Sequence, residues 1–255
     1  MLPLINQFIY RPDATATPIS VTPTSLNLTY EEVELTTSDN INLHGWYLPA
    51  PQPRHTILYC HGNAGNVHDW LQAVPPFLTA GVNVLLWDYR GYGHSTGRPS
   101  EQGLYTDGLT MWHWLANRAQ SDQLPLSLLG KSLGTAVAIY LTTHADIKPH
   151  SLILDSPFTS MREIIATHAP WAPALFLPRL YESLDRAPQI TCPTLILHGQ
   201  QDTLVPPSHG QRLYDALTAP KTIKILPQAG HNNISSFPSY YRWLAQFLTD
   251  PTSLH

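Results

Sequence analysis

Two serines of this chain lie in the pattern Gly-x-Ser-x-Gly, a spacing that can expose a nucleophilic hydroxyl at a sharp turn. One is Ser132, in Gly130-Lys-Ser-Leu-Gly134, and the other is Ser95, in Gly93-His-Ser-Thr-Gly97. A nucleophile turn needs a strand directly before the serine and a helix directly after it. Ser132 stands between an apolar run and a helix-forming run, whereas Ser95 has neither neighbour. We therefore predict that Ser132 is the nucleophile and that Ser95 holds a loop turn.

A serine nucleophile needs a general base, and the base needs an acid that orients it. His231 follows the last apolar run of the chain, and Asp202 follows the run before it. Both positions are carboxyl ends of predicted strands, the same edge of the sheet as Ser132, and the chain order Ser, Asp, His fits this arrangement. We predict that His231 takes the proton of Ser132 and that Asp202 fixes the imidazole. Asp155 also ends a predicted strand and is the alternative acid, whereas His198 lies inside a strand and is expected to pack.

The negative oxygen of a tetrahedral intermediate needs hydrogen-bond donors that are placed in advance. One predicted donor is the backbone N–H of Leu133, the residue after the nucleophile. The second is expected in the loop after the first buried strand, which reads His61-Gly-Asn-Ala-Gly-Asn66. We assign it to the N–H of Asn63. A simpler interpretation, a turn with a helix cap at Asn66, is compatible with that role.

Strands and helices alternate along most of the chain, which predicts an α/β fold with a mostly parallel central sheet and helices on both faces. Short solid apolar runs indicate strands at Thr56–Cys60, Val82–Trp87, Leu126–Leu129, Leu152–Leu154, Thr194–Leu197 and Thr222–Leu226. Helical stretches are expected at Val67–Leu78, Leu104–Asn117, Leu133–His144, Ser208–Leu217 and Ile234–Leu248. Before them, the alternating segments 30–36 and 41–48 predict a hairpin at a sheet edge.

The domain organisation is simple. Residues 1–29 are interpreted as an N-terminal lead-in, and residues 30–255 as one domain. The interval 156–192 is longer than a plain crossover needs, so we predict a short cap over the carboxyl ends of the strands. Its apolar residues Trp171, Phe176, Leu177 and Tyr181 suggest that the cap binds an apolar part of the substrate.

Composition excludes several classes of function. The chain has 255 residues and a net charge of −4, without the basic stripe that nucleic-acid binding requires. Two cysteines fit a reducing compartment. Neither a metal-ligand motif nor a dinucleotide fingerprint is present, so we expect no metal and no cofactor. We expect a cytoplasmic protein; a further hypothesis is weak contact of residues 1–10 with a membrane surface. The oligomeric state is left open.

Two charged residues near these motifs receive simpler interpretations. Asp88 and Arg90 are expected to form an ion pair within their own loop. Lys131, next to the predicted nucleophile, is expected to be exposed.

The motifs taken together resemble the α/β-hydrolase superfamily, over roughly residues 30 to 248. The resemblance rests on 59–66 (YCHGNAGN), 88–97 (DYRGYGHSTG), 130–134 (GKSLG), 155–160 (DSPFTS) and 193–199 (PTLILHG). Within that superfamily, the sequence is similar to a serine-hydrolase subgroup that includes membrane-attached protein depalmitoylases. The resemblance implies the α/β-hydrolase fold, the triad Ser132, Asp202 and His231, and the oxyanion donors Asn63 and Leu133. That subgroup often has a membrane segment where this chain has ten residues, and a glycine where this chain has Thr135.

The expected activity is hydrolysis of a carboxylic ester or thioester through an acyl-enzyme, with a small-molecule acyl substrate. Acyl transfer or amide cleavage by the same triad is the alternative within enzymes. A ligand-binding homologue without turnover is the alternative outside them, because a fold alone does not establish an activity.

Overall fold

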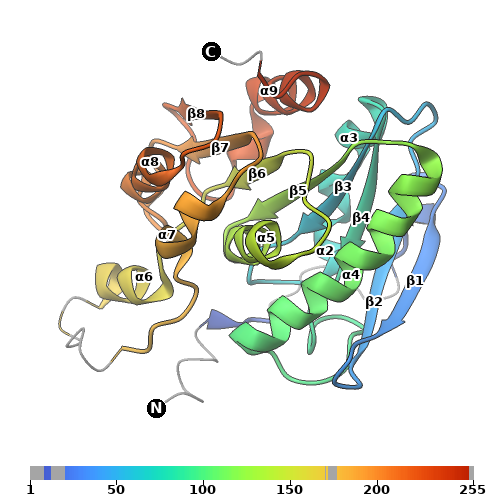
Figure 1. Cartoon of the computed structure of the whole chain (residues 1–255), viewed down its shortest axis with the longest axis horizontal. Helices are drawn as coiled ribbons and strands as arrows, with labels where there is room; N and C mark the ends of the chain where they lie inside the picture. Colours follow the sequence, from blue (N-terminus) through green and yellow to red (C-terminus); the bar gives the residue numbers. More distant parts are fainter. Residues whose placement is uncertain (1–8, 13–20, 170, 172–176, 253–255) are drawn as a thin grey trace.

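A computed structural model describes residues 9–12, 21–169, 171 and 177–252. Its centre is an eight-stranded sheet in the order β1-β2-β4-β3-β5-β6-β7-β8, with helices packed on both faces (Figure 1). The strands are β1 (Glu31–Thr36), β2 (Asn42–Leu48), β3 (His55–Cys60), β4 (Val82–Trp87), β5 (Leu126–Lys131), β6 (Leu152–Asp155), β7 (Thr194–Gly199) and β8 (Lys221–Leu226). This confirms the predicted fold class.

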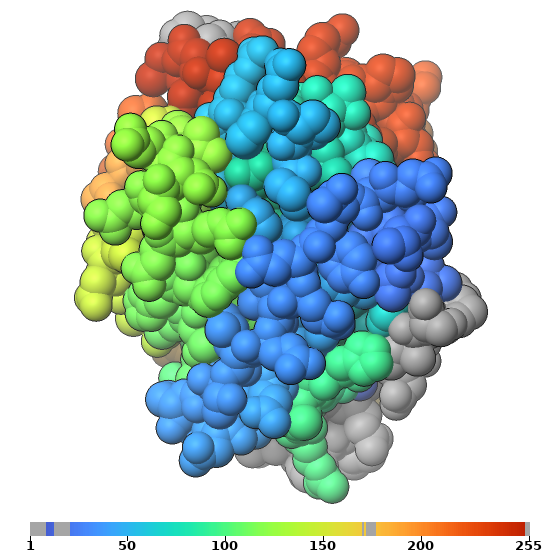
Figure 2. Space-filling model, turned by 90° about the vertical axis from the view of Figure 1, so that its right-hand side faces the viewer, coloured from blue at the N-terminus to red at the C-terminus, as the bar shows by residue number. Residues whose placement is uncertain are grey.

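The sheet is antiparallel only at its first edge. β1 pairs with β2, and β2 with β4, in antiparallel register, while every later pair is parallel. The β1–β2 hairpin lies beside the long helix α4 (Glu101–Asp122), as Figure 2 shows in blue and green. Because all the parallel strands point the same way, the loops after β3, β5, β7 and β8 meet at one edge.

Neighbouring residues of each inner strand face opposite sides of the sheet and enter two separate cores. Leu128 belongs to the core that also contains residues of α4, α5 (Leu133–His144) and α8 (Pro207–Ala216). Leu129 belongs to the core on the other face, together with residues of α2 (Val67–Trp70), α3 (Pro75–Thr79) and α9 (Pro238–Thr249). Solid apolar runs are therefore required in these strands, because both faces are buried.

Two expected helices are interrupted at prolines. The stretch 67–78 divides into α2, the 3₁₀ turn η2 (Leu71–Ala73) and α3, which begins at Pro75. The stretch 234–248 divides into η5 (Ile234–Ser236) and α9, which begins at Pro238. Proline has no backbone N–H and a fixed φ, so it suits the first turn of a helix and not its interior.

The interval 156–192 contains α6 (Met161–His168), α7 (Ser183–Arg186) and the 3₁₀ turn η4 (Ala187–Gln189). Tyr181 is fully buried and Leu177 nearly so, whereas Trp171 is 83% exposed. Phe176, the remaining apolar residue expected in the cap, lies outside the described residues.

The N-terminal region is described only in part. Residues 1–8, most of the segment for which membrane contact was hypothesised, lie outside the described residues, and a 3₁₀ turn, η1 (Pro23–Leu26), precedes β1. Across the described part of the chain, no helix combines the length and apolarity needed to cross a bilayer.

Candidate active site

Ser132 lies in the sharp turn between β5 and α5. Its φ of 51° and ψ of −116° place a non-glycine residue in a strained region, which costs about 1–3 kcal/mol. The flanking glycines permit this turn. A Cβ at Gly130 would lie 2.4 Å from the carbonyl oxygen of Gly134, and one at Gly134 would lie 2.0 Å from that of Cys60. The Thr135 hydroxyl donates a 2.6 Å hydrogen bond to the Ser132 carbonyl, so a threonine fits the turn here.

The structure brings the three residues of the predicted triad together. His231 Nε2 lies 3.0 Å from Ser132 Oγ, and His231 Nδ1 lies 2.7 Å from Asp202 Oδ2. The loops that carry Asp202 and His231 pack closely, because a Cβ on Gly199 would lie only 2.4 Å from the Ala229 carbonyl oxygen. The imidazole is thus placed between the hydroxyl and the carboxylate, in the order that proton transfer from serine requires.

The Asp202 carboxylate is buried and well supported. Its Oδ1 accepts hydrogen bonds from the backbone N–H groups of Leu204 (2.9 Å) and Val205 (2.8 Å). Burial raises the pKa of Asp202, but hydrogen bonds from His198, His231 and the backbone outweigh it and hold the pKa well below its usual value. Asp202 therefore remains a carboxylate at neutral pH, and its Oδ2 lies where it can accept a hydrogen bond from His231 Nδ1.

His198, which was expected only to pack inside its strand, also lies beside the site. Its Nε2 donates to the Val205 carbonyl at 2.8 Å and lies 3.5 Å from Asp202 Oδ2. The side chain is buried, as expected for a strand histidine. The sequence signal for a contact between the two was that His198 precedes Asp202 by only four residues. A histidine inside a strand, however, is usually a packing residue.

The alternative serine and the alternative acid occupy other places. Ser95 Oγ donates to the Asp88 carbonyl (2.8 Å) and accepts from the His44 N–H (2.9 Å), so it holds a loop turn. Asp155 receives hydrogen bonds from Lys131 Nζ (2.8 Å) and from the Tyr240 hydroxyl (2.9 Å). The side chains of Ser95 and Asp155 are therefore hydrogen-bonded to groups other than Ser132 Oγ and the His231 imidazole.

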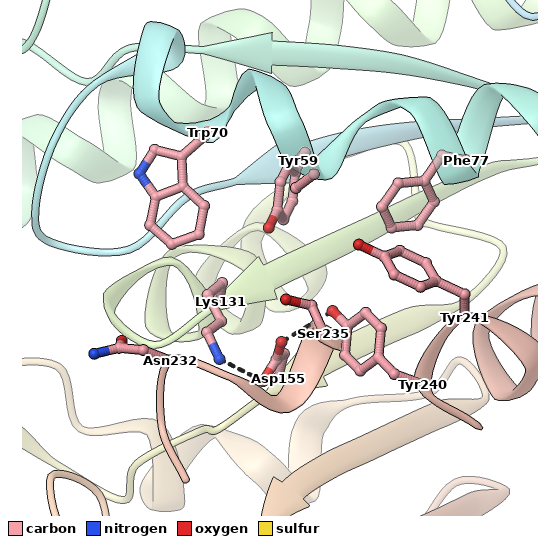
Figure 3. A pocket seen from close by; sticks show the side chains of 10 residues that line it. Tyr59, Trp70, Phe77, Lys131, Asp155, Asn232, Ser235, Tyr240 and Tyr241 are labelled. Atoms are coloured by element: carbon pink, nitrogen blue, oxygen red, sulfur yellow. Dashed lines mark hydrogen bonds and ion pairs between the residues drawn. The ribbon is translucent and has the colours of Figure 1, made fainter. Parts of the chain in front are cut away.

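Lys131 is buried, and the expectation that it is exposed was wrong. Its ammonium group contacts Asp155 Oδ1 and also donates to the carbonyl oxygen of His231, both at 2.8 Å. Figure 3 shows Lys131 and Asp155 in the wall of a pocket. Trp70 and Asn232 lie near Lys131 in this view, and aromatic side chains line the rest of the pocket.

The expected ion pair between Asp88 and Arg90 was also wrong. The Arg90 guanidinium contacts Asp107 and Asp39, each at 2.7 Å. Asp88 is buried and accepts the N–H of Val67 at 2.9 Å. Turn geometry separates the two side chains, and Asp88 instead supports the start of α2, directly after the predicted oxyanion loop.

The predicted oxyanion loop, 61–66, begins at the end of β3, beside the Ser132 turn. The close contact of Gly134 with the carbonyl oxygens of Cys60 and His61 joins the two. Within the described residues, no hydrogen bond engages the N–H of Asn63 or of Leu133. The Asn66 side chain caps α2 by accepting the N–H of His68, so the cap and the predicted donor coexist in this loop.

No group of three or more His, Cys, Asp or Glu residues within the described ranges has the geometry to hold a metal ion. Both cysteines are buried, and burial raises the pKa of each thiol, that of Cys192 to about 12. A buried thiol of raised pKa is a poor nucleophile.

Comparison with known proteins identifies the family of the chain. Residues 55–177 match a family model described as alpha/beta hydrolase fold, and residues 176–235 match one described as serine aminopeptidase, S33. Protein bem46 of Schizosaccharomyces pombe is 34% identical, over 90% of this chain and 80% of that protein. The lysophosphatidylserine lipase ABHD12 of Danio rerio is 34% identical, over 81% of this chain and 61% of that protein.

Solved structures share the fold. A Pyrococcus furiosus esterase superposes with a TM-score of 0.80 at 22% identity, covering 94% of this chain and 97% of that one. An alpha-beta hydrolase from Vibrio vulnificus gives 0.79 at 24% identity, covering 98% and 92%. A resemblance to the depalmitoylase subgroup stays a prediction, while the shared fold and the related sequences establish the family. The chain belongs to the α/β-hydrolase superfamily.

Proposed function

We propose that this protein is a serine hydrolase that cleaves carboxylic esters or thioesters through an acyl-enzyme. The observation that carries the proposal is the hydrogen-bonded chain from Ser132 through His231 to Asp202, at the edge of the sheet where parallel strands end. The strained backbone of Ser132 supports it, since strain of this kind concentrates at functional sites.

The reaction follows from these positions. Ser132 Oγ attacks the acyl carbonyl carbon, and its proton passes to His231 Nε2. The carbonyl oxygen becomes an oxyanion, which the N–H groups of Leu133 and Asn63 stabilise. The carbonyl re-forms as the alcohol or thiol leaves with the proton from His231. Water then attacks the acyl-enzyme with the same base and releases the carboxylic acid and the free serine.

We favour a substrate whose acyl group is apolar. The cap interval holds the apolar residues Trp171, Leu177 and Tyr181, of which Trp171 is exposed and the other two are buried. Apolar surface of the kind that Trp171 presents binds acyl chains better than charged surface does. A structural neighbour that is an esterase and a related lysophosphatidylserine lipase support the same class of substrate.

The test is hydrolysis of p-nitrophenyl esters from acetyl to palmitoyl, with wild type beside Ser132→Ala. We expect turnover that the substitution abolishes, with an optimum of chain length that measures the acyl pocket. Labelling with a fluorophosphonate, followed by peptide mass spectrometry, should place the adduct on Ser132. Turnover that persists in Ser132→Ala would contradict the assignment of the nucleophile, and a flat chain-length profile would contradict the apolar acyl site.

A further inference from the structure

A short N-terminal segment, Ile9–Arg11, pairs with the predicted oxyanion loop although the two are far apart in the sequence. The N–H of Arg11 donates to the carbonyl oxygen of Asn63 at 3.0 Å, and the N–H of Gly65 donates to that of Arg11 at 3.3 Å. The side-chain amide of Asn63 donates to the carbonyl oxygen of Ile9 at 3.0 Å. The segment is therefore hydrogen-bonded both to the backbone of the loop and to the side chain of Asn63.

These contacts converge on Asn63. Its carbonyl oxygen accepts from Arg11 and also from the Tyr92 hydroxyl at 2.9 Å, while its side chain is bonded to Ile9. With the carbonyl and the side-chain amide both engaged, rotation about the backbone bonds of this residue is restricted. Its backbone N–H consequently keeps one direction.

The segment is itself fixed in the molecule. Ile9 and Tyr10 are buried, with 4% and 5% of their surfaces exposed. The Tyr10 hydroxyl lies 2.7 Å from that of Tyr181, which belongs to the cap, and the N–H of Tyr181 donates to Glu101 at 2.7 Å. Figure 1 shows this short blue segment between α6 and the first turn of α4. It thus joins the oxyanion loop to the cap, and Tyr181 of the cap in turn is bonded to α4.

We propose that Ile9–Arg11 is a positioning segment for the oxyanion hole, which orients the Asn63 N–H toward the substrate carbonyl oxygen through the Arg11 and Ile9 backbone. The proposal rests on the proposed function, in which that N–H stabilises the oxyanion. A preorganised donor stabilises the transition state more than one that must first be oriented. Loosening the segment should therefore reduce acylation while leaving the triad in place.

The matched pair Arg11→Pro and Arg11→Ala tests the backbone contact. The Arg11 side chain is exposed, so Arg11→Ala keeps the N–H and the contact, whereas proline removes the donor. With p-nitrophenyl butyrate, we expect Arg11→Pro to lower kcat/KM about tenfold relative to Arg11→Ala, since the donor is misplaced rather than lost. Thermal melts of both variants set an assay temperature at which each is folded.

A second readout reports on the oxyanion itself. A linear alkyl trifluoromethyl ketone is attacked by Ser132 Oγ, whose proton moves to His231 as the ketone oxygen becomes an oxyanion in the hole. We expect Arg11→Pro to raise its Ki by the same factor by which kcat/KM falls. Equal values for the two Arg11 variants would overturn the proposal, and so would a fall in kcat/KM without a change in Ki.

If Arg11→Pro does not fold, Asn63→Ala takes its place, because it breaks the bond to Ile9 and keeps the backbone N–H. We expect it to weaken turnover and ketone binding in parallel, and unchanged values for both would overturn the proposal. Wild type and Ser132→Ala are assayed alongside. Failure of the proposed function would appear there, as turnover independent of Ser132, whereas failure of the positioning role would leave Ser132-dependent turnover intact.

Discussion

The ammonium group of Lys131 donates a 2.8 Å hydrogen bond to the backbone carbonyl oxygen of His231. Lys131 directly precedes the proposed nucleophile, and His231 is the proposed base. A single buried side chain therefore links the loop that carries the histidine to the end of the strand that precedes the serine. Its charge is balanced by Asp155 at 2.8 Å, so the link does not leave an isolated charge in the interior.

Lys131→Met should reduce both stability and turnover. Removing one partner of a buried ion pair costs about 3–5 kcal/mol, because the other charge remains buried without compensation. Turnover should fall as well, since the His231 loop loses its contact with the strand. Urea unfolding and p-nitrophenyl ester kinetics measure the two effects separately.

The double variant Lys131→Met/Asp155→Asn separates these causes. It leaves no uncompensated charge, so we expect stability to recover in large part. The His231 carbonyl still lacks its donor, so kcat should remain low. If turnover returned together with stability, the contact between Lys131 and His231 would have no part in positioning the base.

Loss of Ser132 and loss of His231 should not add. Each of Ser132→Ala and His231→Ala is expected to lower kcat by about 10⁴ or more, and the double variant should be little worse. The reason is that the hydroxyl and the imidazole act as one unit. Single and double variants are compared in the same ester assay, and multiplicative losses would argue against a shared step.

Ser95→Ala is the matched control, because Ser95 lies in the same sequence pattern. We expect it to retain turnover. Its stability should fall by about 1–3 kcal/mol, since the buried N–H of His44 loses its acceptor. A loss of turnover without a loss of stability would reopen the choice between the two serines.

The fold could be predicted because its signals are local. Solid apolar runs mark the doubly buried strands, and Gly130 and Gly134 mark a sharp turn between a strand and a helix, where a Cβ would clash. The places of Asp202 and His231 followed from the same logic, since parallel strands end at one edge. The catalytic roles of these residues stay predictions until the variants are assayed.

Burial of single charged residues could not be predicted in this way. The partners of Lys131 lie 24 and 100 residues further along the chain, so nothing near it in the sequence indicates a buried ammonium group. The same holds for the pairing of Ile9 with Asn63. Such contacts depend on the whole topology, whereas periodicity and spacing report only on the element that contains a residue.

Asp202→Asn should lower kcat by about 10⁴ with little change of fold. The amide retains an oxygen that can accept the N–H groups of Leu204 and Val205. Its NH₂ group, however, favours the wrong tautomer of His231, which then cannot accept the serine proton. Steady-state kinetics measure the loss, and a circular dichroism spectrum like that of wild type is the control. Retained turnover would return Asp155 to consideration as the acid.

Acid sensitivity should arise partly at His55, away from the proposed active site. Burial, with a smaller effect of His150, lowers the pKa of His55 from 6.5 to about 4. The unfolded chain therefore binds a proton at higher pH than the folded one. This contribution to stability is complete above pH 6.5 and is lost as the pH falls toward 4.

When the pH falls from 7.5 to 5, the low pKa of His55 in the folded chain should lower the free energy of unfolding by about 2 kcal/mol. The variant His55→Gln cannot be protonated and can still bond Ser127, which lies 2.8 Å from His55 Nε2. Urea unfolding at the two pH values should show a smaller loss in His55→Gln than in wild type, by about that amount. Equal losses in the two proteins would show that His55 is not the group whose protonation destabilises the fold.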